Sequence, residues 1–414
     1  MKKQKLGIAL LPVFALAGEA ASASGFQLSE ASVANMSRAF AGAGVAGDDL
    51  SAAFYNPAGM SLIKQRGMQA NFTYIHLKSE LNGDKTYSTT LPDPNASGTA
   101  NARIEALVPA LFFVDPINDK LTFGASLTLP FGLGTEYATD AFMANQAVKS
   151  DLQMLELDVS LAYKLTDKFT VGASVGAQQG KATLTSKSPA SGQIVDLTAD
   201  DLRPAFNLGA MYEFDADNRA GLSWRPSVKH DLKGTNESND RPINAELEMP
   251  DVAMASSWHK LSSSLALSTI VKWTNWSEFK ELAIMYRDTG VPLSIVDEGW
   301  QDTWMFGLGL DYTISPEWTV RAGIARDETP VPDKYHRTAR IPDGTRMMYS
   351  LGASWRPTGD WQIDLGYTWM SMADAAIDNT QAIQWGSPIT STLSGEYESK
   401  GASNLIGLAV LKRF

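Results

Sequence analysis

Apolar and polar residues alternate along most of the chain after residue 67. In the stretch 121–129, Leu, Phe and Ala at the odd positions interleave with Thr, Gly and Ser. The stretches 155–163 and 303–312 repeat this period of two. Because successive side chains of a β-strand point to opposite faces, each stretch has one apolar face and one small or polar face. The pattern predicts long β-strands.

The length of these stretches favours a membrane barrel over a soluble sandwich. Strands of soluble proteins average about 5 or 6 residues, whereas a strand that crosses a bilayer needs about 9 to 11. We count about fourteen stretches, a number within the even-numbered series of bacterial barrels. The sequence therefore predicts an all-β fold, a transmembrane antiparallel β-barrel formed by residues 67–414.

The connections between the stretches alternate between short turns and long loops. Outer-membrane barrels have this asymmetry, with short periplasmic turns and long extracellular loops. Both chain ends are then expected on the periplasmic side. The long loops are expected near residues 79–102, 135–151, 186–200, 231–243, 288–298, 328–344 and 373–401.

Aromatic residues gather at the ends of the stretches, where a barrel crosses the two membrane interfaces. This distribution predicts two aromatic belts. The belt beside the short turns contains Tyr163, Phe169, Phe214, Trp258, Trp318, Trp355 and Trp361. The belt near the long loops contains Trp273, Trp276, Trp304 and Trp369.

The N-terminal part of the chain lacks the alternation. Residues 1–23 combine three lysines, a short apolar run and a small-residue cleavage site, which is typical of a secretory signal peptide. An N-terminal helical anchor is the alternative, although the apolar run is shorter than the roughly 20 residues that a spanning helix needs. Residues 24–58 are rich in small side chains. We interpret them as a plug inside the barrel.

The composition limits the kinds of site and partner that the protein can have. The 414 residues contain no cysteine and carry a formal net charge of −11. These features exclude disulfides and thiolate metal sites and argue against a nucleic-acid partner. The histidines show no metal-ligand spacing, and we expect neither a metal nor another cofactor.

Two glycine motifs suggest enzymes but lack the required context. Residues 42–47 fit G-x-G-x-x-G, yet no βαβ unit surrounds them. Residues 172–176 fit G-x-S-x-G, yet they lie inside an alternating strand. We expect a protein that is not an enzyme. An outer-membrane enzyme and a structural or adhesive barrel stay as alternatives.

The third predicted strand is interrupted by Pro130, Phe131, Gly132, Leu133 and Gly134. Proline cannot donate to a strand ladder, and glycine weakens a strand or permits a bend. In a closed barrel the interruption predicts a gap in the wall. A plain strand end near the extracellular rim is the alternative.

Several short motifs are spread along the chain after residue 23. They are residues 25–28 (GFQL), 56–58 (NPA), 114–119 (VDPIND), 130–136 (PFGLGTE), 271–277 (VKWTNWS), 330–332 (PVP) and 341–343 (IPD). Together these motifs resemble the FadL/TodX family of outer-membrane transporters for long-chain fatty acids and hydrophobic compounds, and the resemblance is collinear over almost the whole chain after residue 23.

This resemblance implies a fourteen-stranded barrel around an N-terminal hatch of residues 24–66 that contains short helices. It also implies passive uptake in three steps. The ligand is caught in an apolar groove among the loops, moves to a lumenal pocket touched by the hatch, and leaves sideways at residues 130–134. Ligand contacts are expected from Ser24, Gly25 and Phe26, and the hatch is expected to be pinned by Asn56, Pro57 and Ala58.

The apolar loop stretches 141–144 and 194–195 are candidates for the first groove, with Phe142 and Met143 as contact residues. For fatty acids the resemblance implies cations near the carboxylate, and here the chain departs from the family. Lys187 is offset by one position, which on a strand is the opposite face, and Val296 carries no charge. Lys272 is the substitute candidate.

Long-chain fatty acids are therefore the first expectation, and neutral hydrocarbons or aromatics are the alternative. The terminal Phe414 resembles the signal read by the bacterial barrel-assembly machinery. We expect a monomer in the bacterial outer membrane, with lipid and lipopolysaccharide as its surroundings and a hydrophobic small molecule as its ligand.

Overall fold

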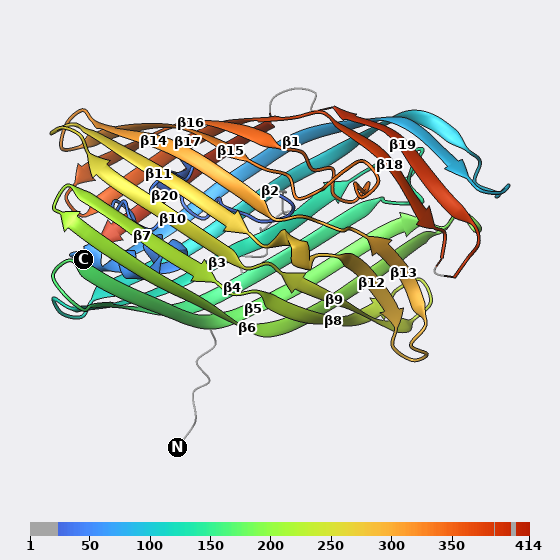
Figure 1. The fold of residues 1–414 in the computed structure, drawn as a ribbon, viewed down its shortest axis with the longest axis horizontal. Coiled ribbons are helices and arrows are strands. Elements are labelled where there is room, and N and C mark those ends of the chain that lie inside the picture. Colours follow the sequence, from blue (N-terminus) through green and yellow to red (C-terminus); the bar gives the residue numbers. More distant parts are fainter. Residues whose placement is uncertain (1–23, 385, 399–402) are drawn as a thin grey trace, which may run out of the picture.

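The computed structural model describes residues 24–384, 386–398 and 403–414; the expected signal peptide lies outside these ranges. The described residues form one antiparallel sheet that closes on itself into a barrel (Figure 1). Closure is made by β1 (Gly67–Tyr87), which pairs with β2 (Ala96–Pro116) on one side and with β19 (Thr390–Glu398) and β20 (Ser403–Arg413) on the other.

Twenty strand segments among the described residues make fourteen barrel strands, because six barrel strands are each split into two segments. The unsplit ones after β2 are β3 (Leu121–Glu136), β4 (Lys149–Lys164), β5 (Phe169–Lys187), β6 (Ile194–Asp215), β15 (Trp318–Asp327) and β16 (Arg346–Thr358). The split ones are β7 (Asn218–Arg225) with β8 (Val228–Asn236), β9 (Arg241–Met249) with β10 (Val252–Lys260), β11 (Leu265–Thr274) with β12 (Glu281–Tyr286), β13 (Pro292–Asp297) with β14 (Thr303–Thr313), β17 (Trp361–Met372) with β18 (Ala375–Ala382), and β19 with β20. The prediction of a barrel of about fourteen strands is confirmed.

Burial follows the predicted alternation of side chains. On β4, Leu157 and Leu161 are more than half exposed on the outer face, while Glu156, Asp158 and Ser160 are buried on the inner face. A soluble protein would reverse this pattern. The outward apolar residues instead form the surface that a bilayer covers.

The aromatic belts are present with two corrections. Trp258, which we predicted in the belt beside the short turns, packs inside the barrel on the cluster of Val45, Ala58 and Met211, with the Arg219 guanidinium 3.9 Å from its ring centroid. Trp318 and Trp355 are exposed and stack with ring centroids 5.9 Å apart, and Trp304 is exposed near the other rim. Trp276, which we predicted in the outer belt, is fully buried inside the barrel. A 3-10 turn, η2 (Trp276–Glu278), separates β11 from β12 and turns this side chain inward.

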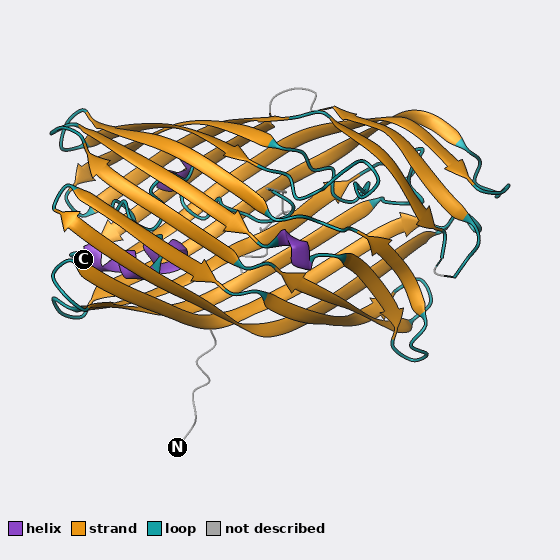
Figure 2. Cartoon of the chain, viewed as in Figure 1, coloured by secondary structure: helices purple, strands orange, loops and turns teal. Residues whose placement is uncertain are grey.

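Residues 24–66 lie inside the barrel, where Figure 1 draws them in blue and Figure 2 shows their short helices in purple. The helices are α2 (Val33–Met36), α3 (Ala52–Tyr55) and the 3-10 helix η1 (Pro57–Leu62). Ser32 caps α2 by accepting a hydrogen bond from the backbone N–H of Asn35. We refer to residues 24–66 as the hatch segment.

Within the described ranges, no helix is long and apolar enough to span a membrane.

Candidate functional site

The lumen contains an apolar cavity with a volume of about 70 Å³, which we call the apolar cavity. Its walls are the inner faces of β4, β5, β6, β8, β9 and β12, whose lining side chains are mostly Leu, Ile and Ala. Phe26 of the hatch segment and Ile341 of the β15–β16 loop complete it. Ligand pockets usually enclose about 300–1,000 Å³, so a long ligand has to displace side chains to enter.

An aromatic cluster centred on Phe26 closes one side of this cavity. The Phe26 ring centroid lies 4.6 Å from Trp276, and 5.5 Å from both Phe279 and Trp300. Gly25 adopts a φ of +60°, and a Cβ atom there would come within 2.5 Å of the Trp300 ring. A side chain at position 25 is therefore excluded both by backbone conformation and by space, and the bare glycine lets Phe26 enter the cluster.

The predicted interruption of β3 leaves a gap in its ladder with β2. The pairing runs to Leu111 and Leu127 and resumes only at Arg103 and Glu136. On the other side of β3, the register with β4 shifts between Thr128 and Phe131. The proline and glycines of the predicted stretch lie within this gap.

The hatch segment supplies the missing backbone partner of β3. The N–H of Leu28 donates to the Pro130 carbonyl at 2.9 Å, and the N–H of Gly132 donates to the Phe26 carbonyl at 2.8 Å. Gln27 and Phe131 thereby form an isolated antiparallel bridge. The start of the hatch segment therefore lies directly behind the break in the wall.

A second cavity, of about 50 Å³, lies on the other side of this bridge. Phe131 lines it, and the Phe131 ring centroid is 6.3 Å from that of Phe26, which lines the apolar cavity. Lys272 also lines it, is 7% exposed, and donates from Nζ to Ser29 Oγ at 2.9 Å. Among the described residues, no carboxylate lies within 4.0 Å of the Lys272 ammonium.

Two acidic groups lie near Lys272 without forming an ion pair with it. Burial raises the pKa of the Glu30 carboxyl to about 7, although the charge of Lys272 acts to lower it. Asp327 of β15 also interacts with the charge of Lys272. The ammonium therefore has acids nearby but no direct ion-pair partner among the described residues.

Arg340 is a cation beside the apolar cavity, and sequence reasoning missed it. Its Nη1 donates to the carbonyls of Lys149 and Thr185 and to Ser150 Oγ, at 3.2, 3.4 and 3.2 Å. Ile341, the next residue in the chain, lines the cavity. Within the described ranges, no acidic side chain forms an ion pair with Arg340. Burial lowers its pKa only to about 10, so it stays charged at neutral pH.

The position of Arg340 in the chain explains why the sequence did not identify it as a cation beside the cavity. The resemblance placed a cation at the end of the fifth strand, and the guanidinium of Arg340 reaches the Thr185 carbonyl at that strand end from a distant loop. Lys187 lines neither cavity, and its backbone N–H donates to the Ala144 carbonyl at 2.8 Å. Sequence position alone did not show which loop folds over β5.

The remaining predicted contact residues are dispersed. Ser24 is buried and donates to the Glu328 carbonyl at 2.6 Å. Phe142 and Met143 line neither cavity; Met143 is fully buried in a separate apolar cluster, and Phe142 packs against it. Ile194 begins β6 and is 40% exposed, so this part of the expected fifth-strand loop is strand.

The motif Asn56-Pro57-Ala58 packs against glycines on the barrel wall. Asn56 donates from Nδ2 to the Ala210 carbonyl at 3.2 Å. A Cβ atom on Gly209 would come within 2.0 Å of Asn56 Oδ1, and one on Gly172 within 2.3 Å of the Ala58 nitrogen. The close approach of hatch and wall therefore depends on missing side chains.

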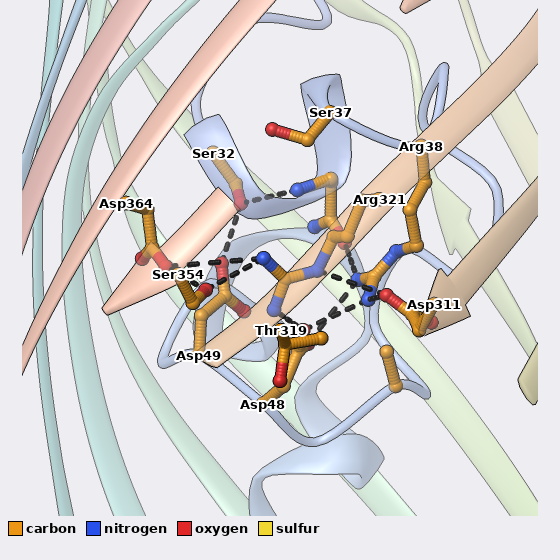
Figure 3. Close-up of polar contacts among 12 residues, drawn as sticks. Ser32, Ser37, Arg38, Asp48, Asp49, Asp311, Thr319, Arg321, Ser354 and Asp364 are labelled. Atoms are coloured by element: carbon orange, nitrogen blue, oxygen red, sulfur yellow. Dashed lines mark hydrogen bonds and ion pairs between the residues drawn. The ribbon is translucent and has the colours of Figure 1, made fainter. Parts of the chain in front are cut away.

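An ionic cluster joins another part of the hatch segment to the wall (Figure 3). Arg38 Nη1 lies 2.8 Å from Asp48 Oδ2 and 2.9 Å from Asp311 Oδ1. Arg321 of β15 contacts the same two carboxylates at 2.7 and 2.9 Å. Asp364 of β17 accepts a hydrogen bond from Ser354 at the edge of the cluster. Two arginines thus share two aspartates, with one of each from the hatch segment and one of each from the barrel.

A β-barrel with an apolar outer face, an internal segment and apolar lumenal cavities defines an outer-membrane channel for hydrophobic compounds. The chain belongs to the outer membrane protein transport protein family (OMPP1/FadL/TodX), whose model matches residues 14–414. This is a family of transport channels, not enzymes, and it places the protein in the bacterial outer membrane.

The relatives agree with this assignment. The chain is 31% identical over 409 residues to the long-chain fatty acid transport protein of Escherichia coli O6:H1, covering 87% of this chain and 90% of the relative. It is 29% identical to outer membrane protein P1 of Haemophilus influenzae, with 95% and 96% covered.

Solved structures share the fold. A FadL homologue of Pseudomonas aeruginosa superposes with a TM-score of 0.84 at 24% identity, covering 94% of this chain and all of that one. The toluene transporter TodX of Pseudomonas putida superposes with a TM-score of 0.66 at 16% identity, covering 95% and 100%.

Proposed function

We propose that the protein takes up long-chain fatty acids by passive diffusion. The observation that carries the proposal is a pair of neighbouring lumenal cavities with one cation each, Arg340 beside the apolar cavity and Lys272 in the second cavity. Neither cation has a carboxylate within 4.0 Å among the described residues. A buried cation is normally paired, so an unpaired one beside an apolar space suits an anion with a long apolar tail. The fatty acid transport protein of E. coli O6:H1 is a relative of matching length.

The proposed route has three stages. The ligand is first caught among the extracellular loops, where Phe142 and Met143 stay candidate contacts. It then occupies the cavity beside Phe26, with Ser24 and Gly25 holding the start of the hatch segment in place. It leaves sideways where β3 is interrupted. Burying apolar surface contributes about 25 cal/mol per Å², so a route from apolar cavity to bilayer keeps the tail out of water.

The test compares an acid with the alcohol of the same chain. Purified wild type is expected to bind oleate more tightly than oleyl alcohol. Lys272→Met and Arg340→Met should each reduce this preference, because a hydrogen bond to a charged group contributes about 1.5–3 kcal/mol, or roughly ten- to a hundredfold. Arg326→Met, which removes an exposed arginine of β15, is the matched control.

The outcome separates two candidate functions. If wild type binds the alcohol and toluene as well as oleate, and both substitutions leave the ratio unchanged, the fatty acid proposal is contradicted. Uptake of neutral hydrocarbons, which the match to TodX keeps in view, then replaces it.

A further inference from the structure

The barrel wall contains a second interruption, between β9 and the start of β12. Below it, β10 and β11 pair continuously from Val252 and Thr274. Above it, β12 pairs with β9 at three positions, Ile243 to Ala245. Within the described residues, no ladder pair joins 246–250 to 276–283, and η2 occupies this space, as Figure 2 shows.

A hollow of about 310 Å³ lies on the outer surface over this break. Along β9 and β12, alternate residues face the hollow and the apolar cavity: Glu246 and Ala283 face outward, and Leu247 and Leu282 face inward. The wall between the two spaces is therefore one strand thick.

Phe279 lines both spaces and follows directly on η2. It is 4% exposed, and its ring centroid lies 4.8 Å from Trp300 and 5.5 Å from Phe26. Toward β9 the backbone at this point makes no ladder bond, whereas on its other side the Phe279 carbonyl accepts from the Trp300 N–H at 3.3 Å. The Phe279 ring, together with the inward side chains of Leu247 and Leu282, separates the cavity from the outside.

The level of the hollow follows from its neighbours. Trp224 and Trp273, both beside Ala253 in the ladder, mark the outer interface directly below the break. Glu246 and Glu281 are exposed on the outer face. A charged side chain on the lipid face destabilises a barrel, most of all at the midplane, so these carboxylates place the hollow outside the hydrocarbon layer.

We propose that this break is a side entrance to the apolar cavity, gated by Phe279, that admits uncharged apolar compounds and disfavours carboxylates. The inference rests on the proposed function of the cavity and adds a route other than the loops. The rim carries four glutamates and two lysines: Glu246, Glu248, Glu278, Glu281, Lys229 and Lys280. Lys229 is engaged by Glu246 at 2.7 Å. The surplus of negative charge repels an approaching anion and is neutral toward an alcohol or hydrocarbon.

The test measures association rates rather than affinities. Purified full-length protein is mixed with bromine-labelled dodecanoate or dodecanol, which quench the tryptophans of the Phe26 cluster on arrival. In the rim variant Glu246→Gln/Glu248→Gln/Glu281→Gln, the association rate of dodecanoate should rise several-fold, on the order of the steering effects known for charged clefts. Added salt should reduce this increase, because it screens the charges of the rim. The association rate of dodecanol should stay within about twofold of the wild-type rate.

A charge-matched control removes three exposed glutamates elsewhere, Glu237→Gln/Glu317→Gln/Glu396→Gln. The gate is tested separately. Phe279→Ala should raise the association rate of dodecanol, and Phe279→Trp should lower it.

Each result decides the matter. If the rim variant behaves like its control and both Phe279 variants leave the rates unchanged, while wild type binds both ligands, the side entrance is refuted and the proposed function stands. If wild type binds neither ligand, the proposed function fails and the entrance fails with it.

Discussion

At the residue scale, the clearest feature is the sharing of Asp48 and Asp311 between Arg38 and Arg321. Both guanidiniums are 1% exposed. Removing one member of a buried pair leaves an uncompensated charge, which costs about 3–5 kcal/mol. The cluster therefore stabilises the hatch segment against the wall only while all four members are present.

Asp48→Asn is expected to weaken the docking of the hatch segment by about 3 kcal/mol, because Arg38 then keeps only Asp311, which it shares with Arg321. Arg321 retains a longer contact with Asp364 at 4.0 Å. Hydrogen exchange of the hatch amides measures this as faster opening. The control is Asp217→Asn, which breaks an exposed pair with Lys260 at 3.5 Å and should cost no more than about 1 kcal/mol. Equal exchange in the two variants would contradict a role of the cluster in docking.

Single residues also show which positions could be predicted from the sequence and which could not. Lys272 could be selected because strand alternation assigns a face to each residue. Trp276 was misassigned because nothing in the local pattern signals that η2 interrupts the strand. Arg340 lies in a loop, and its contact with Thr185, 155 positions away in the chain, depends on tertiary folding.

At the scale of the elements, β3 and the start of the hatch segment form one unit. The interruption of β3 was predictable, since proline and glycine act locally on a ladder. Its partner was not, because the bonds from Phe26 and Leu28 to residues 130 and 132 join segments about 100 positions apart. The approximate number of barrel strands followed from the periodicity.

Gly132→Leu should block the proposed sideways exit, because its side chain has to fit where β3 lacks a neighbouring strand. We expect uptake of radiolabelled oleate, by cells without their own transporter, to fall about tenfold or more with normal barrel assembly. Gly134→Leu should act in the same direction. The control is Gly359→Leu, at a turn where no atom lies within 4 Å of an added Cβ. Full uptake by the Gly132 variant would remove the exit from β3.

At the scale of the whole molecule, the two interruptions of the wall meet the same lumenal region. The break in β3 is backed by residues 26–28, and the break at η2 is backed by Phe279. Both backing elements belong to the cluster around Phe26. The other end of the lumen holds the ionic cluster and the packed motif at Asn56. Transport across the wall, rather than along the barrel axis, agrees with this arrangement.

Deleting residues 24–26 is expected to weaken ligand binding while the barrel stays assembled. The deletion removes the Phe26 ring from the cavity wall and one backbone partner from β3. Burial of a phenylalanine side chain contributes about 1.5–3 kcal/mol, so the affinity for oleate should fall roughly ten- to a hundredfold. Phe26→Ala, which keeps the backbone, separates the two effects: it should reproduce the loss of affinity but retain protection of the Gly132 amide in hydrogen exchange. Heat-dependent mobility on gels reports barrel assembly. Unchanged affinity in the deletion variant would show that the hatch segment is not part of the ligand site.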